Sequence, residues 1–286
     1  MDKRIRIAVQ KSGRLNEDSL KLLKECGIAI DTGADRLKVS SPNFPMDVFF
    51  LRNSDIPQYI EDGVADIAII GENILIEKPH QVDTLMQLGF SRCRVSLAIP
   101  KSDVYPGPSF FSGRKLATSY PNTLRRFLTE RGITAEIHEI SGSVEIAPNI
   151  GLADGICDIV SSGSTLFKNG LKEVEVLHRS EAILISGQNL DTAAQALVHK
   201  LTFRINAVLA ARNNKYILLN APNEKLDEII SLLPGMKSPT ILPLAKPDWS
   251  SLHSVISESE FWEKIDALTA AGAQGILIVP IEKMVL

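Results

Sequence analysis

The sequence predicts an α/β protein whose two lobes form a cleft, followed by a small C-terminal domain with a different order of elements. Short β-branched strands alternate with helices as far as residue 212, which is typical of α/β folds. The pattern Gly-x-x-Asp-Ile at residues 63–67 recurs at 155–159, an offset of 92 residues that favours two related lobes. From residue 215 the order becomes strand, helix, strand, strand, helix, strand, which is the ferredoxin-like order.

The expected first lobe begins with a strand at residues 5–9. Asn16 is a suitable cap for the next helix, which should end at Gly27. Pro57 fits the first turn of a second helix, and Gly63 should end it. Further strands are expected at 37–40, 47–51, 66–70 and 94–99, with a short helix and a strand within 72–90. Residues 100–113, rich in Pro and Gly, should form a crossover loop.

The expected second lobe opens with a strand at residues 115–119. A helix should run from 122 to 131 after Pro121, and another from 144 to 153. Strands are expected at 135–140, 156–160, 174–178 and 182–186, then a long helix at 191–212. We assign 1–96 and 180–211 to the first lobe, 97–179 to the second and 212–286 to the C-terminal domain. The last should hold strands at 216–220, 240–244, 252–256 and 275–280 and helices at 224–233 and 260–271.

Composition narrows the class of protein. The 286 residues are 44% hydrophobic and 23% charged, with a net charge of −3, so there is no general attraction to nucleic acid or anionic membranes. Cys26, Cys93 and Cys157 suggest neither a disulfide framework nor a Cys-x-x-Cys metal site, and the five histidines lack metal-ligand spacing. With no apolar leader and no spanning segment in view, we expect a cytoplasmic protein.

The most informative stretch is residues 153–166, where a short strand leads into small hydroxyl residues around a glycine. Hydroxyls and free backbone N–H groups at such a junction can surround a phosphate. Asp154 and Asp158, just upstream, suit the donor hydroxyls of a ribose. A helix-capping role for the same loop remains an alternative. The predicted phosphate-binding residues are Ser161, Ser162, Gly163, Ser164 and Thr165.

A second candidate is the turn after the first strand, which carries Lys11, Gly13 and Arg14. Two cations at the end of a strand are well placed to reach anionic oxygens across a cleft, although a solvated surface turn is the plain alternative. Tyr120 could stack on a base. Glu145 could lie in the site or complete a helix N-terminus.

These motifs, in this order, resemble the long form of ATP phosphoribosyltransferase over essentially the whole chain. The resemblance is carried by 10–15 (QKSGRL), 55–57 (DIP), 63–71 (GVADIAIIG), 117–121 (ATSYP), 141–148 (SGSVEIAP) and 151–166 (GLADGICDIVSSGSTL), and near the end by 233–235, 239–240 and 280–284. One departure is Gly155, where the family more usually has alanine.

The resemblance implies two periplasmic-binding-protein-like lobes and an ACT-like regulatory domain. It implies transfer of the phosphoribosyl group of phosphoribosyl pyrophosphate to N1 of ATP, with release of pyrophosphate, as the first step of L-histidine biosynthesis. Mg²⁺ would be held mainly by substrate phosphates, with no protein ligand assigned. Histidine and AMP would be inhibitors, and homodimers would be in equilibrium with homohexamers.

The resemblance also implies roles for individual residues. Asp154, Asp158 and Ser161 to Thr165 would bind phosphoribosyl pyrophosphate, and Lys11 and Arg14 would join the two aspartates in catalysis. ATP would lie near Lys11, Gly13, Arg14, Leu15, Asp66, Gly71 and Tyr120. The histidine inhibitor would contact Asn220, Met236, Thr240 and Gly275.

Three other functions stay open from the residues alone. A two-lobed transport receptor would need an export signal, which the sequence does not show. An amino-acid sensor built on the C-terminal domain would leave the first 211 residues unexplained. A phosphoribosyltransferase acting on another base is the third.

Overall fold

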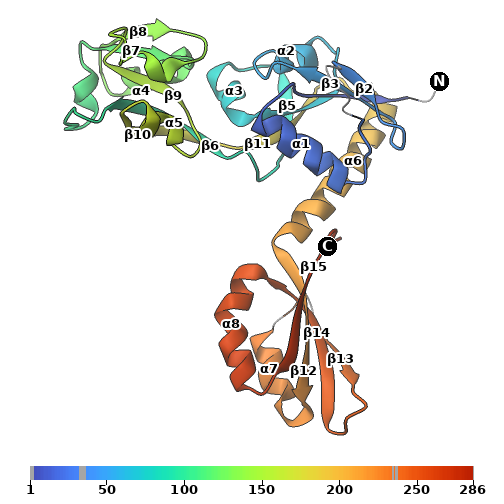
Figure 1. The fold of residues 1–286 in the computed structure, drawn as a ribbon. Coiled ribbons are helices and arrows are strands. Elements are labelled where there is room, and N and C mark those ends of the chain that lie inside the picture. Colours follow the sequence, from blue (N-terminus) through green and yellow to red (C-terminus); the bar gives the residue numbers. More distant parts are fainter. Residues whose placement is uncertain (1–2, 32–36, 234, 236–237, 286) are drawn as a thin grey trace. The chain divides into compact units, whose positions relative to one another are not determined.

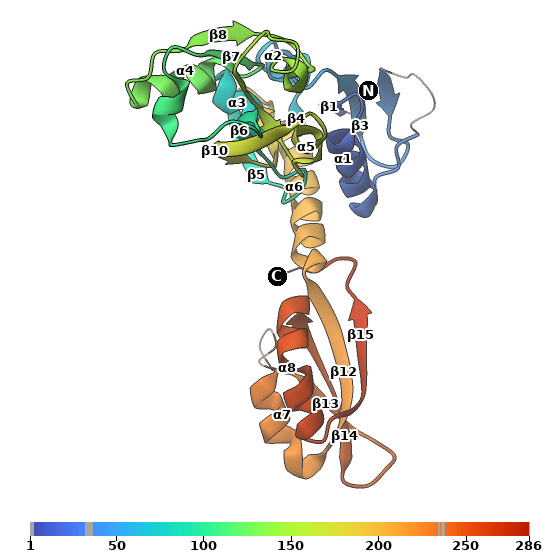
Figure 2. The ribbon, with the colours of Figure 1, turned by 60° about the vertical axis from the view of Figure 1, so that its left-hand side comes forward.

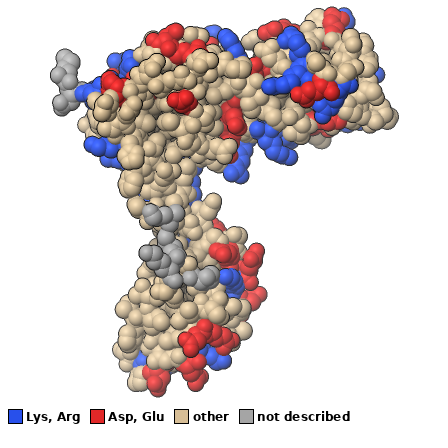
Figure 3. Space-filling view, turned by 180° about the vertical axis from the view of Figure 1, so that it is seen from behind, with Lys and Arg blue, Asp and Glu red and all other residues tan. Residues whose placement is uncertain are grey.

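The structure, a computed structural model, describes residues 3–31, 37–233, 235 and 238–285. The chain forms two compact units, residues 1–198 and 199–286, and the long helix α6 (Thr192–Arg212) contains the boundary (Figure 1). No helix in the described part of the chain is long and apolar enough to cross a membrane. On the face drawn in Figure 3, basic and acidic side chains are interspersed.

The first unit contains two sheets, each with its own helices. The first sheet has the order β2-β3-β1-β4-β11-β5. Its strands are β1 (Ile5–Gln10), β2 (Lys38–Ser40), β3 (Met46–Leu51), β4 (Ile67–Gly71), β5 (Val82–Gln87) and β11 (Ala182–Gly187). The helices associated with it are α1 (Arg14–Glu25), α2 (Ile56–Glu61) and α3 (Glu72–Glu77).

The second sheet has the order β10-β6-β9-β7-β8. Its strands are β6 (Cys93–Pro100), β7 (Lys115–Thr118), β8 (Glu136–Glu139), β9 (Gly155–Val160) and β10 (Leu171–Ser180). The associated helices are α4 (Pro121–Glu130) and α5 (Ser164–Lys168), with 3₁₀ turns at Pro108–Phe111 and Val144–Ile146. Phe111, Leu116 and Leu124 are fully buried in this lobe's core.

The two sheets repeat one plan. The order β3-β1-β4-β11-β5 corresponds strand for strand to β8-β7-β9-β6-β10. In each sheet the central strand, β4 or β9, pairs in parallel with one neighbour and antiparallel with the other. Because the antiparallel partners are β11 and β6, each lobe is completed by a strand that follows a crossing from the other lobe. The two related lobes that the sequence repeat indicates are therefore present in the structure.

The structure changes which aspartates of the two lobes correspond: Asp66 of the first lobe matches Asp154 of the second. The backbone N–H of Asp66 donates to the Arg6 carbonyl, and its carboxylate accepts the Arg6 N–H at 2.7 Å. Asp154, not Asp158, makes the same pair of contacts with Lys115, and its carboxylate accepts the Lys115 N–H at 2.8 Å. At the other end, Gly71 and Gly163 both precede a helix. The second lobe is therefore four residues longer between these landmarks.

Two expected helices differ from the structure. The first begins at Arg14, with Gly13 as its cap residue, because the Asn16 side chain instead donates to the Gln10 carbonyl. The helix expected at 144–153 is only the 3₁₀ turn Val144–Ile146. Pro148 disfavours a continuing helix, and Gly151 with φ of 73° reverses the backbone.

Gly155 has a packing reason in this chain. A Cβ placed there would lie 3.1 Å from the Ala98 carbonyl oxygen and 3.2 Å from Leu116 Cδ2. Both neighbours belong to strands paired with β9. The alanine that is usual in the family would therefore need a small shift of the sheet here.

The second unit has the ferredoxin-like order that the sequence predicts. Its sheet runs β13-β14-β12-β15 with antiparallel pairing throughout, and α7 and α8 lie on one face (Figure 2). Ser257 and Glu260 form a reciprocal capping box at the start of α8. The elements are β12 (Asn214–Pro222), α7 (Leu226–Leu232), β13 (Thr240–Pro243), β14 (Trp249–Ser257), α8 (Glu258–Ala270) and β15 (Gln274–Pro280).

Candidate functional site

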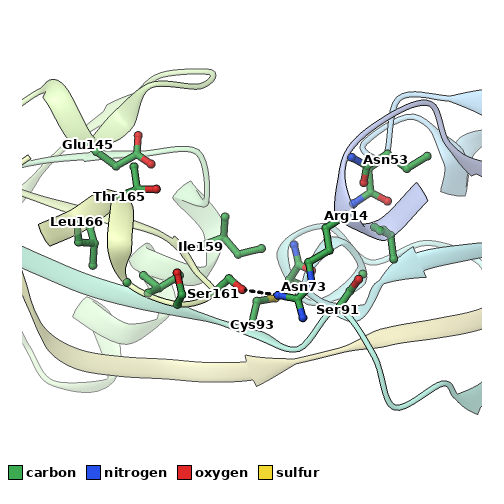
Figure 4. A pocket seen from close by; sticks show the side chains of 16 residues that line it. Arg14, Asn53, Asn73, Ser91, Cys93, Glu145, Ile159, Ser161, Thr165 and Leu166 are labelled. Atoms are coloured by element: carbon green, nitrogen blue, oxygen red, sulfur yellow. Dashed lines mark hydrogen bonds between the residues drawn. The ribbon is translucent and has the colours of Figure 1, made fainter. Parts of the chain in front are cut away.

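A pocket of about 400 Å³ lies where strand ends from both lobes of the first unit meet (Figure 4). Junctions β1–α1, β4–α3 and β9–α5 contribute most of its wall, as expected for ligand sites at the carboxyl ends of strands. The lining residues are Gln10, Arg14, Leu15, Asn53, Gly71, Asn73, Ser91, Cys93, Glu145, Ile159, Val160, Ser161, Ser162, Gly163, Thr165 and Leu166.

The predicted phosphate loop forms one wall of this pocket. Gly163 adopts φ of 78° as the cap residue of α5, a left-handed conformation that favours glycine. The first N–H groups of a helix lack partners within it and can bind an anion. At α5 the Ser164 N–H donates to Ser162 Oγ at 3.4 Å, a long bond that leaves the turn's next N–H groups to a ligand. Ser162 Oγ donates to Ser164 Oγ at 3.0 Å, which orders the turn. Thr165 lines the pocket beside Glu145.

Arg14 brings a cation from the first lobe to this loop. It is the first residue of α1, and Gly13 with φ of 84° makes the turn before it. Its Nη1 donates to Ser161 Oγ at 3.2 Å, the dashed contact in Figure 4. The Arg14 side chain remains 68% exposed, so it can move toward a bound anion.

Arg94 reaches the same loop from the second lobe. Its Nη1 donates to the Ser161 carbonyl at 3.0 Å, while its Nε and Nη2 donate to the Glu173 carboxylate. These bonds lower the pKa of Glu173 and raise that of Arg94, so both groups stay charged. Sequence reasoning missed Arg94 because its partner Glu173 lies 79 residues further along the chain.

Asn73 occupies the floor between the lobes. Its Nδ2 donates to the Tyr120 hydroxyl at 2.8 Å, and its Oδ1 accepts from Ser180 Oγ at 3.1 Å. Gly71 makes room for this amide, since a Cβ there would lie 2.3 Å from Asn73 Oδ1. Tyr120 is buried, which raises its pKa, and it supports Asn73 from behind the pocket wall. The structure therefore assigns Tyr120 a neighbouring position, outside the lining residues.

Asp158 also lies behind the wall. It is 8% exposed and accepts from Ser119 Oγ at 2.7 Å. Burial raises the pKa of its carboxyl, and the charge of Glu145 adds to that effect. Glu145, weighed only as a weaker candidate from the sequence, is the one carboxylate among the described lining residues.

Other predicted residues lie outside the pocket lining in the described chain. Lys11, Gly13 and Ser164 adjoin lining residues without lining the pocket themselves. Asp66 and Asp154 lie at the amino ends of the β4 and β9 strands, opposite the ends that carry the pocket. Their carboxylates accept backbone N–H groups of the neighbouring strands, at Arg6 and Lys115. We therefore remove both aspartates from the candidate site.

Replacing Asp66 by alanine is expected to lower the free energy of unfolding by about 2 kcal/mol. The Asp66 side chain is only 6% exposed, and its carboxylate accepts hydrogen bonds from both the guanidinium and the backbone N–H of Arg6, each at 2.7 Å. The KM for ATP should change less than about twofold. Chemical denaturation and steady-state kinetics check this. Asp62→Ala, on the exposed end of the preceding helix, is the matched control. A large rise in KM with unchanged stability would restore Asp66 to the site.

Further polar groups enter the pocket from segments that no motif marked. Asn53 Oδ1 is buried and has no hydrogen-bond partner among the described residues, so it is available to a ligand. Ser91 and Cys93 come from the segment that crosses between the lobes, and Gln10 ends β1. In the described ranges no group of three or more His, Cys, Asp or Glu could hold a metal. The pocket's donors therefore fit phosphate oxygens better than a bare cation.

The residues expected to bind histidine are not all together in the second unit. Asn220 and Gly275 are neighbours on β12 and β15, where a Cβ on Gly275 would be 3.2 Å from Asn220 Nδ2. Thr240 lies on β13, at the opposite edge of the sheet. Met236 lies outside the described residues. Within one subunit, a single histidine molecule could therefore contact Thr240 at one edge of the sheet or Asn220 and Gly275 near the other, but not all three.

The fold and the site together define a class: a two-lobed α/β protein with a pocket in which a hydroxyl-rich loop of one lobe faces an arginine of the other. Such an arrangement is suited to a phosphorylated ligand. The ATP phosphoribosyltransferase family model matches residues 52–207, and the model described as HisG, C-terminal domain, matches 211–283.

Curated relatives and a solved structure agree with these matches. ATP phosphoribosyltransferase of Cytophaga hutchinsonii is 56% identical over 98% of both chains. ATP phosphoribosyltransferase of Phocaeicola vulgatus is 56% identical, and the alignment covers 99% of this chain and 100% of the relative. The ATP phosphoribosyl transferase (HisG:HisZ) complex from Thermotoga maritima aligns with a TM-score of 0.59 at 27% identity, covering 70% of this chain and 98% of that one. The chain belongs to the ATP phosphoribosyltransferase family, pentosyltransferases of the first step of histidine biosynthesis.

Proposed function

We propose that phosphoribosyl pyrophosphate binds with its 5-phosphate on the loop of Ser161 to Thr165, and that ATP lies opposite, on the side of Arg14 and Leu15. The phosphoribosyl group then passes to N1 of ATP. The observation that supports this arrangement is the Arg14–Ser161 contact, which brings anion-binding groups of both lobes to one pocket. Two polyanions in one cleft need such groups from both sides.

The reaction breaks the bond between the anomeric carbon and pyrophosphate and forms a bond from that carbon to adenine N1. Positive charge develops on the sugar while negative charge develops on the leaving group. Glu145, facing the loop, is placed to stabilise the sugar, and Arg14 to stabilise the pyrophosphate. Adenine N1 attacks with its own lone pair, so the site needs no general base. Bound Mg²⁺ would be held mainly by the substrate phosphates and would neutralise the leaving group.

The remaining residues support these roles. Arg94 holds the loop through the Ser161 carbonyl, and Asp158 holds Ser119 behind it. Asn53 Oδ1 is an acceptor suited to the adenine amino group on the first-lobe side. Lys11 adjoins the Arg14 turn and contributes long-range charge to the ATP phosphates.

The test is to incubate the full chain with ATP, phosphoribosyl pyrophosphate and Mg²⁺. Mass spectrometry should detect N1-phosphoribosyl-ATP, formed in equal amount with released pyrophosphate. Free adenine, orotate and nicotinate serve as alternative acceptors, since a phosphoribosyltransferase for another base would prefer one of them. Absence of the ATP adduct from correctly folded protein would overturn the proposal.

We propose that the second unit makes the enzyme sensitive to histidine, with AMP competing at the catalytic pocket. The support is the separate compactness of residues 199–286 and their match to a distinct C-terminal domain. We further propose a cytoplasmic homodimer in equilibrium with a homohexamer.

Histidine is expected to inhibit the full chain, whereas a chain truncated after Arg212 should retain activity and lose this inhibition. The catalytic pocket is built from residues 10–166, so truncation removes none of its wall. Initial rates with and without histidine check this, with AMP inhibition as the control, which both chains should retain. Histidine inhibition that survives truncation would place the effector site in the first unit.

A further inference from the structure

Helix α4 of the second lobe begins without a cap of its own. In the described chain, the side chain of its cap residue, Tyr120, makes no capping hydrogen bond, and Pro121 has no N–H to donate. The Tyr120 N–H is satisfied by Thr118 Oγ1 at 2.8 Å. The N–H groups of Asn122 and Thr123 are therefore the ones that need acceptors from elsewhere.

Glu77, the last residue of α3 in the first lobe, supplies both acceptors. Its Oε1 accepts the Asn122 N–H at 2.7 Å and its Oε2 accepts the Thr123 N–H at 2.9 Å. Asn122 Nδ2 returns a bond to the Glu77 carbonyl at 3.2 Å. Arg126 Nη2 adds one to the Ile76 carbonyl, also at 3.2 Å. The negative end of α3 thus faces the positive end of α4 across the two lobes.

The same short helix also builds the pocket. Asn73, in the first turn of α3, lines the pocket and bonds Tyr120 and Ser180. Within the described residues of the first unit, the backbone passes from one lobe to the other around residues 91–93 and 180–182, each time as a single extended segment. The four hydrogen bonds between α3 and α4 therefore add a non-covalent link between the two lobes to these two crossings.

We propose that Glu77 is a positioning residue: by capping α4 from the other lobe it holds the phosphoribosyl site at the distance from the ATP site that the transfer requires. This inference rests on the proposed function, because it concerns the geometry of that reaction. Glu77 lies outside the pocket lining in the described chain, so we assign it a role in geometry and not in substrate binding.

Glu77→Ala is expected to lower kcat about tenfold or more, because transfer between two separately bound substrates is sensitive to misplacement of about 1 Å. Binding of phosphoribosyl pyrophosphate alone, measured by calorimetry, should change less than about twofold, since its loop stays intact. Glu77→Gln, whose amide oxygen still accepts a hydrogen bond, should recover part of the rate. Glu130→Ala, at the exposed C-terminal end of α4, should leave kcat unchanged.

Asn122→Asp separates positioning from stability. A carboxylate in the first turn of a helix stabilises that helix, and its Oδ1 could still accept the hydrogen bond from Arg125. The new carboxylate would also lie against the carboxylate of Glu77 and repel it. We expect a kcat lowered about threefold or more with no loss of thermal stability. A wild-type kcat in both Glu77→Ala and Asn122→Asp would overturn the inference. So would an equal loss of substrate binding in Glu77→Ala. Inactive wild-type protein would instead count against the proposed function.

Discussion

Replacing Arg14 by alanine is expected to lower kcat/KM for the transfer by about 100-fold to 1,000-fold, the range found when one preorganised donor to a developing negative charge is removed. Arg14 is the lining residue that contacts the phosphate loop from the facing lobe, through Ser161 Oγ. In the proposed arrangement it stabilises the negative charge of the pyrophosphate that leaves the sugar. Steady-state kinetics with each substrate varied in turn measure the effect.

Two variants serve as controls for Arg14. Arg14→Lys keeps the charge without the planar fork, so it should recover only part of the loss. Lys11→Ala removes a cation three residues away that lies outside the pocket lining, and its effect should stay below about tenfold. Equal losses in Lys11→Ala and Arg14→Ala would mean that general positive potential, not the Arg14 contact, matters here.

Replacing Thr165 by alanine is expected to raise the KM for phosphoribosyl pyrophosphate about tenfold or more, because a hydrogen bond to a charged group contributes about 1.5–3 kcal/mol. The KM for ATP should change less than about twofold. Thr165 lines the pocket at the start of α5, beside the N–H groups proposed to hold the 5-phosphate. The two KM values measured on one preparation check the difference.

Ser164→Ala is the matched control for Thr165. Ser164 has the same kind of hydroxyl one residue earlier, but it bonds Ser162 within the turn and lies outside the pocket lining. Its KM for phosphoribosyl pyrophosphate should therefore rise less than that of Thr165→Ala. Equal rises for both substrates in Thr165→Ala would show that the loop acts structurally.

The fold could be predicted well from local patterns. Alternating strands and helices, with Gly27, Gly63 and Gly132 just after helices, marked most elements within a few residues. One error arose because the Asn16 side chain bonds the Gln10 carbonyl instead of capping its helix. The other arose because Pro148 and Gly151 end the segment expected to be helical after the turn at Val144–Ile146. The shared strand plan of the two lobes could not be read from the sequence, because strands β6 and β11 exchange between them.

The candidate site could be predicted from the sequence only where its residues are adjacent along the chain. The loop from Ser161 to Thr165 was recognisable because its hydroxyls and glycine are adjacent in sequence. Arg94 and Asn73 were missed because their partners, Glu173 and Tyr120, are distant along the chain. Asp66 and Asp154 were included because a repeated motif marks folding contacts as readily as function.

A crystal structure of the full chain with phosphoribosyl pyrophosphate and Mg²⁺ tests the proposed substrate arrangement most directly. We expect the 5-phosphate within about 3 Å of N–H and hydroxyl groups of the 161–165 loop. The pyrophosphate should then face Arg14, with Asp154 well removed from the ribose. A 5-phosphate bound elsewhere, or a ribose held by Asp154, would contradict it.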